Sequence, residues 1–180
     1  SYETGIHDCN IYSNGNTGIN ATGNAPVSNT TVITQGDVGV NLTGANGSTC
    51  YTGRNSTDPV KITNCTFRSV NAPAIYSYLK PIILANSTLI SEGDAVITGY
   101  NHSNTYIQTK DCFIQSDYDD ADGNGIELST STNNEIIDCF IQTTATGANA
   151  LAPIGSSAIT FSFAGNQFEG MTTAINPLIT

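Results

Sequence analysis

The feature that most constrains this chain is a short motif that recurs along its 180 residues. In segment 60–67 it reads Val-Lys-Ile-Thr-Asn-Cys-Thr-Phe, with an Asn or Asp pivot between β-branched and small residues. The pivots are Asp8, Asn29, Asn64, Asn86, Asp111 and Asp138, with Gly165 in a degenerate seventh copy. Successive pivots are 21 to 35 residues apart. Periods in this range indicate a solenoid or another repeat architecture.

The residue types at the pivot predict a bend between two short strands. Asn, Asp and Gly adopt a left-handed backbone at low steric cost. In an unbroken strand Ile62 and Phe67 would face opposite sides, because side chains alternate with period two. A bend at Asn64 instead allows Ile62, Cys65 and Phe67 to face the interior and leaves Thr66 outside.

A second landmark, a small residue followed by a β-branched one, predicts a third strand in each repeat. The β-branched member comes ten to fifteen residues after its pivot in Gly18-Ile19, Gly39-Val40, Ala74-Ile75, Ala95-Val96, Gly125-Ile126 and Ala174-Ile175. Alternation along this strand predicts one outward row, formed by Asn20, Asn41, Tyr76, Ile97, Glu127 and Asn176.

With its pivots and third strands, the chain resembles the right-handed parallel β-helix of the pectate-lyase-like superfamily, in which an asparagine ladder lines a tight turn. The resemblance implies an all-β, single-stranded, right-handed parallel β-helix with about seven coils and three short strands per coil. Residues 1–180 would form one such domain, and the abrupt ends of the repeat pattern indicate a segment of a longer chain. The insertion at 44–58 is expected to project as a loop.

Charge and hydropathy argue against two classes of partner. The chain has five Lys and Arg against 15 Asp and Glu, for a net charge of −10. Phosphate binding requires clustered basic residues, so neither nucleic acid nor an anionic membrane surface is an expected partner. No apolar run is long enough for a membrane span or a signal peptide.

Four cysteines directly follow pivots, namely Cys9, Cys65, Cys112 and Cys139. This placement predicts a column of small, buried free thiols. Cys112 and Cys139 lie on successive coils, so a disulfide between them is geometrically conceivable as the alternative.

The acidic segment 117–127 contains a candidate metal site. Asp120, Asp122 and Asn124, followed by Gly125, reproduce the opening of a calcium loop, D-x-D-x-N-G. The twelfth loop position is Ser131 instead of a bidentate Glu, so the alternative is a solvated acidic turn. Calcium is the one cofactor that the sequence suggests.

Carbohydrate-active members of the superfamily bind substrate along the outward face of the third strand. The resemblance therefore implies Tyr76 and Glu127 as substrate-binding residues, with an ordinary exposed strand aromatic as the alternative for Tyr76. Glycoside hydrolysis requires two carboxylates flanking the scissile bond. Glu127 with Asp94 is the candidate catalytic pair, and Glu92 and Asp122 are alternative partners.

Two further surface features suggest contacts. Phe113 and Phe140 take outward positions on successive coils and should form a stacked aromatic patch, which would meet a neighbouring subunit, a covering segment or a sugar. Asn46 and Asn55, in the projecting loop, are the most natural glycan acceptors among eight Asn-x-Ser/Thr triplets.

Three function classes remain. The first is an extracellular or virion-surface domain, like a phage tailspike or fibre, that engages host cell-surface polysaccharide as a homotrimer and in some versions depolymerises it. The second is a fragment of a secreted polysaccharide lyase or glycoside hydrolase. The third is a structural stalk or adhesin without catalytic activity. We expect the first.

Overall fold

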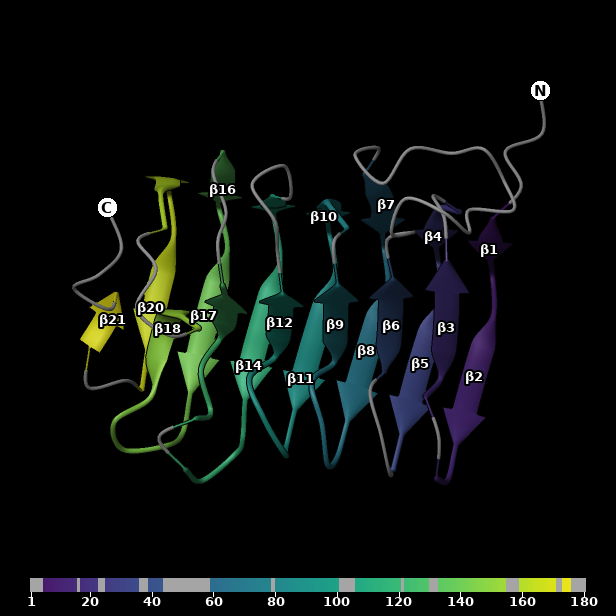
Figure 1. The fold of residues 1–180 in the computed structure, drawn as a ribbon, viewed down its shortest axis with the longest axis horizontal. Helices are drawn as coiled ribbons and strands as arrows, with labels where there is room; N and C mark the ends of the chain where they lie inside the picture. Colours follow the sequence, from purple (N-terminus) through teal and green to yellow (C-terminus); the bar gives the residue numbers. More distant parts are fainter. Residues whose placement is uncertain are drawn as a thin grey trace.

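A computed structural model describes residues 5–15, 17–22, 25–35, 39–43, 59–78, 80–100, 106–120, 122–129, 133–154, 159–170 and 173–175. The chain folds as an all-β parallel solenoid with three strands per coil, as expected from the repeats. Its strands lie side by side in sequence order along the long axis (Figure 1). No helix in the described ranges has the length and apolar character to cross a membrane.

The described strands form three parallel sheets of seven strands each. Sheet A contains β1 (Ile6–His7), β4 (Val27–Ser28), β7 (Val60–Thr63), β10 (Ile82–Ala85), β13 (Ile107–Lys110), β16 (Asn134–Ile137) and β19 (Phe161–Ala164). Sheet B contains β2 (Asn10–Ser13), β5 (Thr31–Thr34), β8 (Thr66–Ser69), β11 (Thr88–Ser91), β14 (Phe113–Ser116), β17 (Phe140–Thr143) and β20 (Gln167–Glu169). Sheet C contains β3 (Ile19–Thr22), β6 (Val40–Thr43), β9 (Ile75–Tyr78), β12 (Ile97–Tyr100), β15 (Ile126–Leu128), β18 (Asn149–Pro153) and β21 (Thr173–Ile175).

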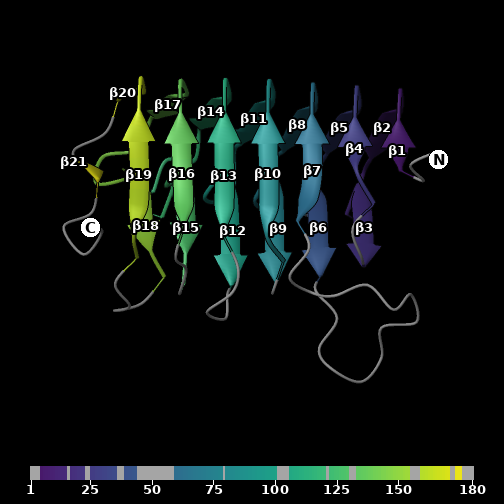
Figure 2. The ribbon, with the colours of Figure 1, turned by 90° about the horizontal axis from the view of Figure 1, so that it is seen from above.

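Sheet A is seen face-on in Figure 2, where β1 to β19 follow one another from the N-terminal to the C-terminal end. The strands pair in register, so that Ile62 of β7 lies beside Leu84 of β10, and Leu84 lies beside Thr109 of β13. Stacking of equivalent positions explains why the motif repeats, because each interior side chain packs on its counterpart in the next coil.

The pivot prediction is confirmed. Asp8, Asn29, Asn64, Asn86, Asp111 and Asp138 have φ between 48° and 54°, and Gly165 has φ 67°. This left-handed bend directs Ile62, Cys65 and Phe67 into the core and leaves Thr66 exposed. Part of the pivot column is joined by side-chain hydrogen bonds: Asn29 Nδ2 donates to Asp8 Oδ1 (3.0 Å), and Asn64 Nδ2 donates to Asn29 Oδ1 (3.3 Å).

The residue after the pivot closes the turn by donating a hydrogen bond. The hydroxyls of Thr30 and Ser87 donate to the carbonyl two residues earlier, in each case over 2.8 Å. Cys65, Cys112 and Cys139 donate through their thiols to the equivalent carbonyl at 3.1 to 3.2 Å. In these five copies a small residue with a polar hydrogen serves the turn, whereas Asn166 of the seventh copy donates to Ile136 O of the neighbouring coil instead. All four cysteines of the column are free, and the last three are buried, as predicted.

The expected number of coils needs correction, because the structure supports about five turns, not seven. Each sheet has seven described strands, but the first and last of them have a neighbour on one side only. In those coils β1 has two residues, and Phe163 of β19, which pairs with buried Ile136, is 40% exposed. Only the turns between them are stacked on both sides, and a repeat motif alone does not distinguish a terminal coil from a complete turn.

One register prediction was wrong. Ile97 was assigned to the outward row, but it is fully buried and pairs with Ile75, so that Thr98 takes the outward position beside Tyr76. The landmark in this coil is therefore Val96-Ile97, one residue later than predicted. The distance from the pivot predicts the correct register, since Ile19, Val40, Ile75 and Ile97 each follow their pivot by eleven residues.

Candidate functional site

Glu127 stands out on the outward face of sheet C. It lies between Ile126 and Leu128, both fully buried, and its own side chain is half-buried on the opposite side of β15. The seven strands of sheet C contain no other charged residue. A single ionisable group among uncharged strands is a candidate functional residue.

Asn124 holds the Glu127 side chain in place. Its Nδ2 donates a hydrogen bond to Glu127 Oε1 at 2.5 Å. Its Oδ1 accepts from the backbone N–H of Asn149 at 2.6 Å and from Asn149 Nδ2 at 3.1 Å. Because both ends of the buried amide are engaged, its orientation is fixed, and the Glu127 carboxylate is positioned by a group anchored on the next coil.

The turn that carries Asn124 is compact because it contains glycine at a close contact. A Cβ on Gly125 would lie 2.7 Å from the carbonyl oxygen of Ala150 and 2.6 Å from Ile141 Cγ2. The backbone of this turn also joins the neighbouring coils, since Gly125 N donates to Asn149 O (2.9 Å) and Ile97 N donates to Gly125 O (3.1 Å). The position of Glu127 therefore follows from the stacking of three coils.

Burial and neighbouring acids shift the protonation of Glu127. Desolvation raises its pKa most, the hydrogen bond from Asn124 opposes the shift, and the charges of Asp94 and Asp122 add to it, so that the pKa of Glu127 lies at about 6. A carboxyl group with a pKa near 6 can hold a proton close to neutral pH, as a general acid must.

Asp94 lies in the turn between β11 and β12 and belongs to the same electrostatic cluster. Burial raises the pKa of its carboxyl group, against a backbone hydrogen bond from Ala95 N to Oδ1 at 2.7 Å, and the charge of Asp122 adds to the rise. The structure thus brings Asp94, Asp122 and Glu127 into one cluster from two different turns and a strand.

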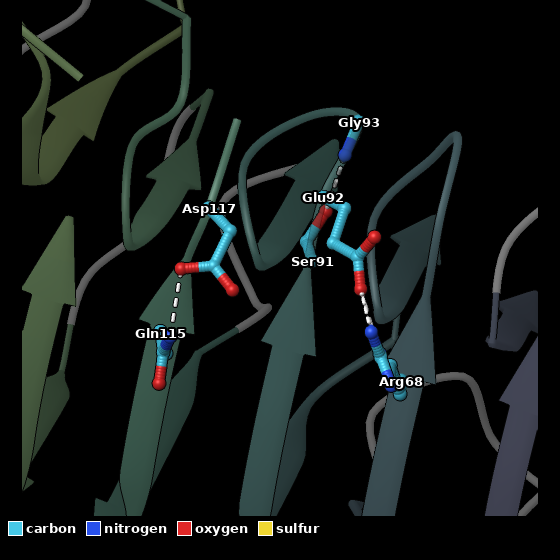
Figure 3. Close-up of polar contacts among 6 residues, drawn as sticks. All are labelled: Arg68, Ser91, Glu92, Gly93, Gln115 and Asp117. Atoms are coloured by element: carbon cyan, nitrogen blue, oxygen red, sulfur yellow. Dashed lines mark hydrogen bonds and ion pairs between the residues drawn. The ribbon is translucent and has the colours of Figure 1, made fainter. Parts of the chain in front are cut away.

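Glu92, the other alternative partner of Glu127, is engaged elsewhere. Its carboxylate accepts hydrogen bonds from the Arg68 guanidinium, with Nε to Oε1 at 2.7 Å (Figure 3). In the next coil Gln115 Nε2 donates a hydrogen bond to Asp117 Oδ1 at 2.7 Å (Figure 3). These two acids make local contacts at the end of sheet B, whereas Asp94 and Asp122 act on Glu127.

Tyr76 and Thr98 precede Glu127 in the outward row of sheet C. Thr98 pairs directly with Tyr76 on one side and with Glu127 on the other. Although it points outward, Thr98 is only 6% exposed, and its Oγ1 has no hydrogen-bond partner among the described residues. Thr98 was not predicted in this row, because the residue types of the landmark placed Ile97 there.

The three predicted calcium ligands have different environments. Asp120 and Asp122 are exposed, whereas Asn124 is buried, and its side-chain oxygen already accepts two hydrogen bonds from Asn149. Within the described ranges, no group of three or more His, Cys, Asp and Glu side chains is arranged to hold a metal ion. Calcium at this turn stays a prediction.

The aromatic patch forms as expected on sheet B. The Phe113 and Phe140 rings stack with centroids 5.4 Å apart and planes 3° from parallel, and both side chains are half-buried. Their role in an interface stays a prediction. The projecting loop at 44–58 and its candidate glycan acceptors Asn46 and Asn55 lie outside the described residues.

Comparisons of the chain with protein-family models, curated proteins and solved structures find no significant match.

Proposed function

We propose that this protein is an extracellular or virion-surface domain that engages a host cell-surface polysaccharide through the outward face of sheet C. The observation that carries the proposal is the Glu127 cluster, a half-buried carboxylate oriented by Asn124 beside two other acids, Asp94 and Asp122. Tyr76 is in the same row and offers an aromatic side chain to a sugar. In this proposal the solenoid is a right-handed β-helix of the pectate-lyase-like kind.

Cleavage of the bound polysaccharide is the second candidate function, and the raised pKa of Glu127 favours it. Glycosidases pair a carboxyl group that holds a proton with a second carboxylate across the scissile bond. In this proposal Glu127 is the proton donor and Asp94 is the second carboxylate. A secreted hydrolase or lyase would use the same residues.

Binding and cleavage are tested together on the purified protein. A glycan and capsular-polysaccharide array, with and without calcium, would identify a ligand, and an assay for new reducing ends would detect cleavage. Glu127→Gln should abolish cleavage, while Glu135→Gln, outward on β16 of sheet A, is the matched control and should not. Binding without cleavage would leave a receptor-binding domain, and no binding to any glycan would favour a structural stalk or adhesin.

We also propose that the domain is a homotrimer that buries the Phe113–Phe140 patch. The outward positions of β11, β14 and β17 are Thr88, Ile90, Phe113, Gln115, Phe140 and Gln142, none of which is charged. An uncharged strip with stacked aromatics is typical of a contact surface. Sedimentation equilibrium should give a trimer that dissociates in the Phe113→Ser/Phe140→Ser variant, but not in Tyr12→Ser, which removes a 71% exposed aromatic from the same sheet.

A further inference from the structure

In the described part of the chain, the positively charged residues lie outside the strands of sheet C. Lys61 and Lys110 are on strands of sheet A, and Arg68 of sheet B is paired with Glu92. Lys80 follows β9 and is buried, with interactions of its own. The strands of sheet C contain neither Lys nor Arg nor His. Within the described chain, the carboxylates of the cluster therefore have no basic residue in their own sheet to balance them.

A second observation points to a ligand at the same place. Thr98 is in register with Glu127 on the adjacent strand, so the two side chains lie on one face, about 4.8 Å apart along the solenoid axis. Its buried Oγ1 lacks a hydrogen-bond partner among the described residues. A buried hydroxyl without a partner is costly, which is a reason to expect a polar atom from outside the chain beside it.

We infer that the Glu127 site takes a glycan whose sugar carries a free, protonated amino group, held by Glu127, Asp94 and the Thr98 hydroxyl. This inference rests on the proposed function and specifies its substrate class. An ammonium group has three donors and no acceptor, which complements two carboxylates and one hydroxyl oxygen. Its positive charge also relieves the mutual repulsion of the three acids, which neither a neutral nor an anionic sugar can do.

The amino group also selects against related sugars. An N-acetylated sugar has the same ring but no positive charge, so it loses the charge-assisted hydrogen bonds to the carboxylates. A uronate sugar would place a fourth carboxylate among Asp94, Asp122 and Glu127, where like charges repel. The order of affinity expected at this site is therefore amino sugar, then N-acetylated sugar, then uronate.

Isothermal titration calorimetry at pH 7 and low ionic strength tests the inference with three oligosaccharides of equal length. Glucosamine and N-acetylglucosamine oligomers form the matched pair, and a galacturonate oligomer is the anionic probe. We expect the glucosamine oligomer to bind about tenfold more tightly than its acetylated counterpart, the ratio that a charge-assisted hydrogen bond supplies. The preference should weaken with added salt.

Variants assign the preference to the site. Glu127→Gln should abolish the discrimination between amine and acetamide, and Thr98→Val should reduce binding of the glucosamine oligomer without unfolding the protein. Glu135→Gln should leave both affinities unchanged. Equal affinity for the matched pair, tighter binding of the galacturonate oligomer, or a preference that survives Glu127→Gln would overturn the inference and leave glycan binding intact. Failure of every glycan on the array to bind would instead overturn the proposed function, and this inference with it.

Discussion

The interior of the solenoid and the outward face around Glu127 are built on the same coils but follow opposite physical rules. Inside, the columns are mostly apolar: Ile62, Leu84, Thr109 and Ile136 occupy equivalent positions, and all are buried. Outside, the row begins with Asn20 beside Asn41 and then changes residue type at each coil, to Tyr76, Thr98 and Glu127. The outward row contains an acid with a raised pKa and a buried hydroxyl, that of Thr98, without a partner in the described structure. Among the described residues, the inward hydroxyl of Thr143 is the other buried side-chain polar atom that lacks one.

This difference separates the residues that the fold requires for stability from those that are available to a functional site. Repetition along the chain is a consequence of stacking, so the repeated positions report on stability. Departures from repetition at outward positions have no such cause, and sites are often places where local stability is given up. Substitutions taken from the interior outward test this separation.

Replacement of a buried aromatic side chain should have the largest effect on the free energy of unfolding. Phe67 is fully buried in β8, so Phe67→Ala leaves a cavity and should lower the free energy of unfolding by about 3 to 5 kcal/mol. Phe113→Ala removes the same atoms from the outward side of sheet B and should cost about 1 kcal/mol. Urea denaturation measures both, with Phe67→Leu as a milder variant in case the alanine variant does not fold. Equal losses at the two positions would contradict the division into interior and surface.

The pivot should be next in importance. Asn64 has φ 54° and donates a hydrogen bond to Asn29, so Asn64→Ala should cost about 2 kcal/mol through backbone strain and the lost bond. Asn64→Gly keeps the left-handed backbone accessible and should cost about half as much. Chemical denaturation of both variants separates the two contributions. If glycine were as damaging as alanine, the side-chain bond rather than the backbone would determine the cost.

The outward acid should behave in the opposite way, because its removal stabilises the protein. Burial and the charges of Asp94 and Asp122 raise the pKa of Glu127 from 4.5 to about 6 in the folded state. Stability therefore falls as pH rises from about 4.5 to about 6, where the folded protein must release a proton that the unfolded chain has already lost. Glu127→Gln should raise the free energy of unfolding by about 1 to 2 kcal/mol at pH 7 and by nothing below about pH 4.5.

Thermal unfolding across this pH range measures the effect, and Glu135→Gln should change stability by less than about 0.5 kcal/mol at any pH. A shallow dependence on pH should remain in Glu127→Gln, because burial also raises the pKa of Asp94. A pH-independent gain would mean that the charge of Glu127 is not what destabilises the folded state.

The surface ion pair should matter least. Arg68 and Glu92 pair at the end of sheet B, and the Arg68 side chain is 49% exposed. A double-mutant cycle with Arg68→Ala and Glu92→Ala should give a coupling of about 0.5 kcal/mol that disappears in high salt. A coupling energy as large as the cost expected for Asn64→Ala would mean that this surface ion pair stabilises the protein as much as a pivot residue does.

Most of the fold could be predicted from the sequence because each coil repeats the same requirement. The pivots specified the left-handed turns, the inward positions of Ile62, Cys65 and Phe67, and the stacking of Phe113 on Phe140. The register of the fourth coil was missed because Ala95-Val96 matches the residue types of the landmark as well as Val96-Ile97 does. The constant distance from the pivot was the better guide.

The site was only partly accessible to sequence reasoning. Glu127 and Asp94 could be nominated by type and position, but the buried amide of Asn124 and its anchor Asn149 are 25 residues apart. The pKa of Glu127 depends on burial and on acids from other turns, and a local sequence motif indicates neither of them. The number of turns was overestimated for a similar reason, since a copy of the motif does not reveal whether it has neighbours on both sides.

The parallel stacking also determines how the protein would respond to force. Hydrogen bonds between coils run along the solenoid axis, so tension along that axis loads the coils in series, and each contact between neighbouring coils must bear all of it. Asn64 and Asn86 are 22 residues apart, so peeling off one such coil would lengthen the chain by about 70 to 80 Å. Under load the domain would therefore extend in discrete steps, one coil at a time, and absorb work at each step.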